Sequence, residues 1–223
     1  MGAADPFLDR HNTVHRVRPE PAPVRDLSRE RRAQIGRMQF DYLLAHGLRP
    51  EHHVLEIGCG ILRAGRLLIE HLDAGHYYGI DVSPAILLAA QDTLVREGLQ
   101  SKLPHLVLVG DLTFGFLPEG YFDVVHAHSV FAHSPRQVVE QCLAHVGRVL
   151  APGGFFDFTF NRSEGRERQV LHDDFSYRTR TLAGLAARHG LKARFMDDWE
   201  RLPYRQSKMR LTLMSDRART VGP

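Results

Sequence analysis

A glycine-rich turn and two aspartates have the types and spacing that could bind a nucleoside-containing ligand. Gly58 and Gly60 directly follow the apolar run 53–57, and Asp81 and Asp111 stand at or just after the ends of the next two apolar runs. Glycines let backbone amides approach a ligand closely. A ribose diol is held well by one carboxylate at a strand end, and an adenine amine needs an acceptor. The pattern therefore predicts a nucleotide-type site.

Each of these features has a simpler structural alternative. Asp81 could cap the helix that Ser83 and Pro84 begin, and Asp111 could form an Asx turn. A dinucleotide-binding turn would need a third glycine at position 63, where this chain has Arg63. Nicotinamide dinucleotide binding therefore loses support.

Three histidines, His126, His128 and His133, follow or end the apolar run 122–127. Histidine accepts a proton near neutral pH, so His128 and His133 are the candidate general bases. Strand alternation places His126 and His128 on one face, and each of the three could instead have a structural role. Three histidines could bind zinc, but no carboxylate joins them, so we predict that there is no metal site.

Alternating short apolar runs and helical patterns position these residues. The helical patterns cover 26–47, 62–72, 84–97, 136–150 and 177–189. The runs that predict strands are 53–57, 76–80, 105–109, 122–127, 155–160, 193–196 and 209–214. Strands that alternate with helices indicate an α/β fold, with a parallel sheet that helices cover on both faces.

Length and composition favour one domain with a short arm. The 223 residues, 43% of them hydrophobic, can bury one sizeable core, which we place at 28–223. Residues 1–27 contain spaced prolines and predict an extended arm or lid. No apolar stretch reaches membrane-spanning length, and no secretory signal is visible. Cys59 and Cys142 are the only cysteines and suit a reducing compartment, so we expect a cytoplasmic protein without membrane partners.

The net charge of +3 is unevenly distributed. Residues 38–161 carry a net charge of −6, whereas 1–37 carry +3 and 162–223 carry +6. Basic flanks can attract phosphate-bearing partners. The charge is scattered arginine among acids, however, which favours a solvated, salt-bridged surface over a nucleic-acid interface.

The motifs, taken in order, resemble those of the class I S-adenosylmethionine-dependent methyltransferases. They are Glu56-Ile-Gly-Cys-Gly60, Tyr78-Gly-Ile-Asp81, Gly110-Asp-Leu112, Phe122-Asp-Val-Val-His126 and Leu150-Ala-Pro-Gly-Gly154. The resemblance implies a Rossmann-like, doubly wound, mostly parallel seven-stranded sheet with an antiparallel last strand. It also implies S-adenosylmethionine as cofactor, with Asp81 at the ribose and Asp111 at the adenine amine. The implied cofactor-binding residues are Glu56, Gly58, Cys59, Gly60, Arg63, Asp81, Val82, Asp111, Leu112 and His126.

Leu62 and Arg63 follow the glycine-rich turn. Many family members carry a further glycine where this chain has Leu62, so the backbone there could differ. Arg63 could hold the methionine carboxylate of the cofactor or pair with a surface acid such as Glu70. Farther along the chain, Trp199 and Tyr204 could pack over the acceptor pocket or close the sheet edge.

The expected function is metal-independent methyl transfer to O or N of a small-molecule acceptor, with His128 or His133 as the base. Two alternatives remain: an RNA or protein acceptor, which the basic flanks motivate, and a non-catalytic S-adenosylmethionine-binding protein. The acceptor's identity does not follow from the fold, and homo-oligomerisation stays open.

Overall fold

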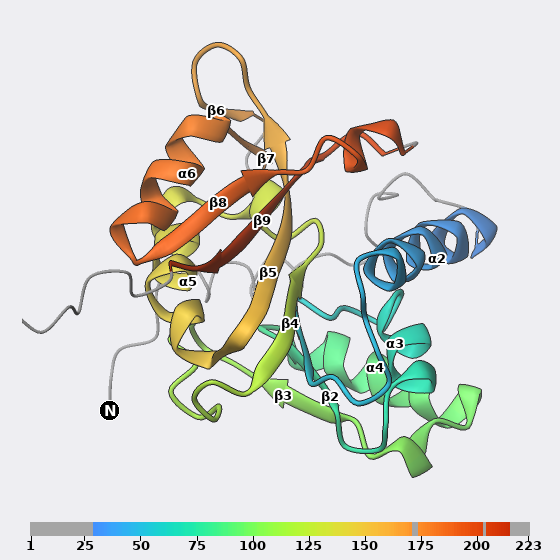
Figure 1. The fold of residues 1–223 in the computed structure, drawn as a ribbon. Helices are drawn as coiled ribbons and strands as arrows, with labels where there is room; N and C mark the ends of the chain where they lie inside the picture. The colour runs from blue at the N-terminus through green and yellow to red at the C-terminus, as the bar shows by residue number, and fades with distance from the viewer. Residues whose placement is uncertain (1–28, 171–173, 203, 215–223) are drawn as a thin grey trace, which may run out of the picture. The chain divides into compact units, whose positions relative to one another are not determined.

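The computed structural model describes residues 29–170, 174–202 and 204–214 (Figure 1). These residues form two compact units. Unit 1 comprises the described residues up to 112 together with 124–128, and unit 2 comprises 113–123 and the described residues from 129 onward. The proposed arm, 1–27, lies outside the described residues, and the single domain at 28–223 stays a prediction.

Unit 1 is built on parallel strands in the order β3-β2-β1-β4. β1 is fully buried, as its apolar sequence Val-Leu-Glu-Ile predicts except at the glutamate. Because parallel strands all end at the same edge, the loop after β1, the end of β2 and the end of β4 lie along one edge of this sheet. The strands are β1 Val54–Ile57, β2 Tyr77–Asp81, β3 His105–Leu108 and β4 Phe122–Ala127, whose first two residues belong to unit 2.

Three helices accompany these strands: α2 Arg29–Ala45, α3 Gly65–His71 and α4 Pro84–Glu97, with the short η1 Gln100–Lys102 after them. α4 has the predicted bounds because local signals fix both ends. The Ser83 hydroxyl accepts a hydrogen bond from the Ile86 amide, Pro84 opens the helix, and Gly98 ends it in the left-handed conformation. α3 contacts both α2 and β2.

Unit 2 holds the antiparallel part of the sheet. β9 Ser207–Leu213 pairs antiparallel with β5 Leu150–Arg162 and with β8 Leu191–Phe195, which confirms the antiparallel last strand. Helices α5 Arg136–Val149 and α6 Thr179–Arg188 pack on each other and on β5 and β8 respectively. The core is aromatic and fully buried, and it includes Phe131, Phe156, Phe158, Phe160 and Trp199.

Two strands of unit 2 were not predicted. β6 Arg168–Val170 and β7 Asp174–Tyr177 form an antiparallel pair, and β7 pairs parallel with the end of β5. The sequence predicted a helix from residue 177, but α6 begins at Thr179 because Tyr177 still belongs to β7. Strands of three and four residues are too short to show a periodicity that could be recognised from the sequence alone.

Charged residues are buried on one face of β5 and β9. Asp157 accepts two hydrogen bonds of 2.7 Å from the Arg210 guanidinium, and Lys208 Nζ lies 3.9 Å from the same carboxylate. Lys208 also lies 4.0 Å from the centre of the Trp199 ring, and its burial lowers its pKa to about 8. Trp199 therefore packs inside unit 2, where its indole N–H donates to the Gln206 carbonyl at 2.8 Å.

Among the described helices, none combines the length and the apolar character that crossing a membrane would require.

Candidate functional site

The glycine-rich loop after β1 is fastened to the end of β2. The amides of Gly58 and Cys59 both donate to the Ile80 carbonyl, at 2.8 and 3.0 Å. Gly58 and Gly60 have φ values of 67° and 56°, which lie in the left-handed region that glycine adopts without strain. A Cβ built on Gly60 would meet nothing within 4 Å, so the loop is open on that side.

Asp81, the last residue of β2, connects this loop to α4. One carboxylate oxygen accepts from the Gly60 amide at 3.1 Å, and the other accepts from the Ser83 amide at 3.0 Å. A carboxylate has about four acceptor positions, so these two bonds leave capacity for two more. A ribose diol needs two. The donor and acceptor set at this strand end therefore fits the sugar of a nucleoside.

Glu56 lies beneath the loop as a buried support. Its carboxylate accepts a 2.5 Å hydrogen bond from the Tyr77 hydroxyl, and the residue is 4% exposed. Burial raises the pKa of Glu56 to about 7, although the Tyr77 hydrogen bond and the Arg63 charge both oppose the rise. Gly65, the first residue of α3, permits this arrangement, because a Cβ there would lie 2.5 Å from the Tyr77 oxygen and 2.9 Å from the Glu56 carboxylate.

Leu62 keeps the backbone conformation of the glycine that it replaces. Its φ is 63°, and its side chain is completely buried. The left-handed conformation costs a non-glycine residue about 1–2 kcal/mol, and full burial of leucine contributes about 1.5–3 kcal/mol. The turn is thus preserved, and its strain is offset by packing. Because the chain is left-handed at Leu62, α3 begins at Gly65, which corrects the predicted start at 62.

The remaining residues predicted at the cofactor differ in exposure. The Cys59 side chain is buried against Gly79 of β2, so only its backbone is available to a ligand. Val82 is half-buried, Asp111 is exposed after β3, and Leu112 is buried. Their contacts with a cofactor stay predictions.

His126 and His128 stand at the end of β4, with ring centres 6.1 Å apart. His126 is fully buried, and its Nε2 lies 3.4 Å from the Gln39 side-chain oxygen of α2. His128 is half-buried. The predicted cofactor contact of His126 stays a prediction, and its observed role is to join β4 to α2. Gln39 was not predicted, although a glutamine between Met38 and Phe40 on a packed helix was a usable signal.

The span that contains this site is similar to known proteins. Residues 55–156 match a protein-family model described as a methyltransferase domain. Within this span the chain is similar to the class I S-adenosylmethionine-dependent methyltransferases. The matched span begins in β1 and ends in β5, so it contains the glycine-rich loop, Asp81 and Asp111. The cofactor of this class is S-adenosylmethionine, as predicted.

The curated relatives that the chain matches differ in the acceptors that their names give. A sterol 24-C-methyltransferase of Gibberella zeae is 31% identical over 120 residues, which are 53% of this chain and 30% of the relative. A ribosomal RNA small subunit methyltransferase C of Alcanivorax borkumensis is 31% identical over 137 residues, which are 59% of this chain and 39% of the relative. The chain thus spans about a third of the length of these proteins.

Solved structures share the fold over nearly the whole chain. Magnesium protoporphyrin IX methyltransferase from Synechocystis PCC 6803, solved with bound S-adenosylhomocysteine, aligns with a TM-score of 0.62 at 15% identity and covers 93% of this chain and 94% of that one. A methyltransferase from Leishmania major aligns with a TM-score of 0.68 at 17% identity, covering 95% and 87%. The Rossmann-like fold class is confirmed.

In unit 2, the segment after β4 is held by β7. His133, at the end of η2 Phe131–His133, lies with its Nδ1 3.1 Å from the Asp174 carboxylate, and both side chains are about half exposed. The Tyr177 hydroxyl donates to the Ser134 carbonyl. The sequence predicted His133 but not its partner, because β7 itself was not recognised.

Among the described residues, no three His, Cys, Asp or Glu side chains gather so that they could hold a metal ion.

A hydroxyl-rich cluster adjoins the same segment. Ser129, with a φ of 63°, donates its amide to the Thr159 hydroxyl at 2.8 Å, and its own hydroxyl lies 3.3 Å from the Tyr204 hydroxyl. The Gln206 side chain contacts both Ser129 and Thr159. A strained residue that several hydrogen bonds hold in place is typical of functional segments. Tyr204 thus joins a polar cluster of unit 2.

The raised pKa of Glu56 predicts a pH dependence of stability. The folded state holds the proton up to about pH 7, whereas an unburied glutamate has an ordinary pKa of 4.5. The folded state therefore binds more protons between these values, and stability falls as the pH rises through them. Relative to Glu56→Gln, the wild type should lose about 2–3 kcal/mol of unfolding free energy between pH 5 and 8. Urea unfolding at several pH values measures this. The exposed Glu70→Gln is the control, and parallel pH profiles for the wild type and Glu56→Gln would contradict the assignment.

Proposed function

We propose that the chain transfers the methyl group of S-adenosylmethionine to O or N of a small-molecule acceptor. The observation that carries the proposal is the Asp81 carboxylate, which joins the Gly60 amide to the start of α4 and keeps two acceptor positions for a ribose. The methyltransferase family match supports it. When bound, the cofactor supplies an electrophilic methyl group on a sulfonium, and the protein must chiefly orient the nucleophile in line with that methyl.

The residues of unit 1 bind and orient the cofactor in this proposal. Asp81 accepts from the ribose hydroxyls, and Asp111 accepts from the adenine amine. The open side of Gly60 admits the cofactor next to the loop. Arg63 is available to the methionine carboxylate, since its exposed side chain follows the loop directly. Glu56 does not contact the cofactor in this proposal. Its buried carboxylate holds Tyr77 and the start of α3 in place under the loop.

His133 is the general base that we favour over His128. Asp174 contacts Nδ1 of His133 and orients the ring, and in this proposal Nε2 accepts the proton from the acceptor. Asp174 is then a positioning residue. A carboxylate that orients an imidazole in this way also stabilises the imidazolium that forms when the proton is taken.

The base assignment predicts a separation of turnover from cofactor binding. His133→Ala should lower kcat by about 10²-fold or more, since general-base catalysis contributes about 10²–10⁴-fold. Asp174→Asn should lower kcat by a smaller factor. The Kd for S-adenosylhomocysteine, measured by calorimetry, should stay unchanged in both. His145→Ala on α5 is the control. Equal losses of turnover and of cofactor affinity would indicate packing instead of catalysis.

The test of the function is a transfer screen. The wild-type chain is incubated with methyl-labelled S-adenosylmethionine and a metabolite extract, and the labelled product is identified by mass. Label in a small molecule is the expected result. Label that appears in RNA would favour the second candidate function, an RNA acceptor, which the similarity to a ribosomal RNA methyltransferase and the basic flanks motivate. Absence of transfer to any fraction would contradict both.

A further inference from the structure

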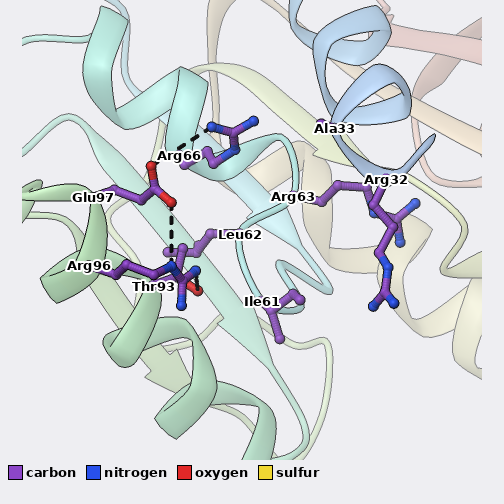
Figure 2. A pocket seen from close by; sticks show the side chains of 9 residues that line it. All are labelled: Arg32, Ala33, Ile61, Leu62, Arg63, Arg66, Thr93, Arg96 and Glu97. Carbon is purple, nitrogen blue, oxygen red and sulfur yellow. Dashed lines mark hydrogen bonds and ion pairs between the residues drawn. The ribbon is translucent and has the colours of Figure 1, made fainter. Parts of the chain in front are cut away.

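A pocket of about 700 Å³ in unit 1 is lined by four arginines and one glutamate. Arg32 comes from α2, Arg63 and Arg66 from the loop and first turn of α3, and Arg96 from α4 (Figure 2). Glu97 is the only acid in the lining. The other lining residues are Ala33, Ile61, Leu62 and Thr93. Three helices and the end of the cofactor loop thus bring cations to one cavity.

The guanidinium of Arg96 is held in place. Its Nη2 donates to the hydroxyl of the buried Thr93 at 3.1 Å, and its Nε lies 3.5 Å from Glu97. The Thr93 hydroxyl in turn donates to the Ala89 carbonyl at 3.0 Å. Glu97 also lies 4.0 Å from the Arg66 guanidinium, so that it stands between two arginines (Figure 2). Positioned guanidinium groups bind an anion at a lower entropy cost than freely rotating ones.

A close helix approach brings the other two arginines to the pocket. A Cβ on Gly36 of α2 would overlap the carbonyl oxygen of Arg63, so α2 lies directly against the end of the loop. Arg32 stands about one helical turn before Gly36 and therefore reaches the same cavity as Arg63. Only glycine at position 36 allows this contact.

The lining of the pocket is cationic. It contains four guanidinium groups and one carboxylate. Like charges that line a concave surface raise the local concentration of anions. A single carboxylate, such as that of the cofactor's methionine, carries one negative charge. A phosphate group carries about −1.5 to −2 at neutral pH and offers three acceptor oxygens, which match the planar donor forks of several arginines.

We propose that this arginine pocket binds a phosphate group of the methyl acceptor, so that the substrate is a phosphorylated small molecule. The inference rests on the proposed function and deepens it. The pocket adjoins the cofactor loop, because Ile61, Leu62 and Arg63 line it directly after Gly60. A phosphate held there anchors the acceptor beside the cofactor.

The direct test measures inorganic phosphate binding by calorimetry. The wild type should bind phosphate, and Arg66→Gln and Arg96→Gln should each weaken binding by about tenfold or more, since each loses one charge-assisted interaction. Arg188→Gln is the matched control, because Arg188 is also paired with a helical glutamate, Glu140 at 2.9 Å, but lies in unit 2. An absence of phosphate binding, or equal binding by all four proteins, would overturn the proposal.

A second titration separates the acceptor from the cofactor. Saturating phosphate should leave the Kd for S-adenosylhomocysteine unchanged, because in this proposal Arg66 and Arg96 bind the phosphate and Arg63 is left to the methionine carboxylate. If phosphate and S-adenosylhomocysteine compete, the arginines serve the cofactor's carboxylate and the proposal is overturned. Failure of S-adenosylhomocysteine to bind, with phosphate binding intact in the wild type, would count against the proposed function and not against the anion site itself.

The source of the phosphate is tested with the metabolite extract. Pretreatment of the extract with a phosphomonoesterase, which is removed before the assay, should abolish label transfer to small molecules. Unchanged transfer would show that the acceptor carries no phosphomonoester group and would overturn the acceptor assignment. Label recovered in RNA after the same pretreatment would also overturn it.

Discussion

Asp81→Asn is expected to raise the Kd for S-adenosylhomocysteine by about 30-fold or more while the chain stays folded. The carboxylate accepts from two backbone amides at 3.0 and 3.1 Å, and in our account it also accepts from both ribose hydroxyls. Hydrogen bonds to a charged group contribute about 1.5–3 kcal/mol each, and the neutral amide weakens all of them. It also turns an amino group toward one of the two N–H donors. Calorimetric titration measures the affinity, and urea unfolding measures the stability.

Asp92→Asn is the matched control for this variant. Asp92 lies on α4 in the same unit and is exposed, so its replacement should leave both affinity and stability unchanged. A folded Asp81→Asn variant with wild-type affinity would show that the ribose is not bound at this strand end.

Gly65→Ala is expected to cost about 2–3 kcal/mol of unfolding free energy and to weaken cofactor binding together with it. The added Cβ would lie 2.5 Å from the Tyr77 hydroxyl, 2.8 Å from a Leu62 methyl group and 2.9 Å from the Glu56 carboxylate. Overpacking of a close-packed site costs about 1–3 kcal/mol, and loss of the buried Tyr77 hydrogen bond adds to it. Because Leu62 and Glu56 support the loop, its geometry should change as well.

Gly184→Ala is a control for which we expect the opposite change in the free energy of unfolding. Gly184 lies inside α6, and a Cβ there would meet nothing within 4 Å. Alanine should therefore stabilise the chain by about 0.5–1 kcal/mol, since glycine is a poor helix former. If Gly65→Ala were as stable as Gly184→Ala, the close packing of α3 on Tyr77 and Glu56 would be contradicted.

Local signals made part of the fold predictable. The bounds of α4 follow from Ser83, Pro84 and Gly98, which act within one turn of the helix ends. The start of α3 could not be predicted in the same way. Leu62 looks like a helical residue in sequence, and only its burial in the tertiary structure maintains its left-handed backbone.

Some features of the candidate site also follow from local sequence, whereas others depend on tertiary contacts. Motif order predicted the loop and Asp81, because both follow from spacing along the chain. The residues that hold these side chains come from distant positions in the sequence. The Tyr77 hydroxyl of β2 donates to the Glu56 carboxylate of β1. Asp174 contacts His133 from β7, a strand too short to show a hydrophobic periodicity. The arginine pocket likewise requires α2, α3 and α4 to meet, and the scattered arginines gave no sign of this in the sequence.

The most direct measurement is a pair of calorimetric titrations of the wild-type chain, one with S-adenosylhomocysteine and one with NAD. We expect saturable binding of S-adenosylhomocysteine and no binding of NAD, because Arg63 stands in place of the third glycine that a dinucleotide-binding turn needs, and because we assign Asp81 to the ribose. A folded chain that binds NAD, or that fails to bind S-adenosylhomocysteine, would contradict the cofactor assignment on which the proposed function depends.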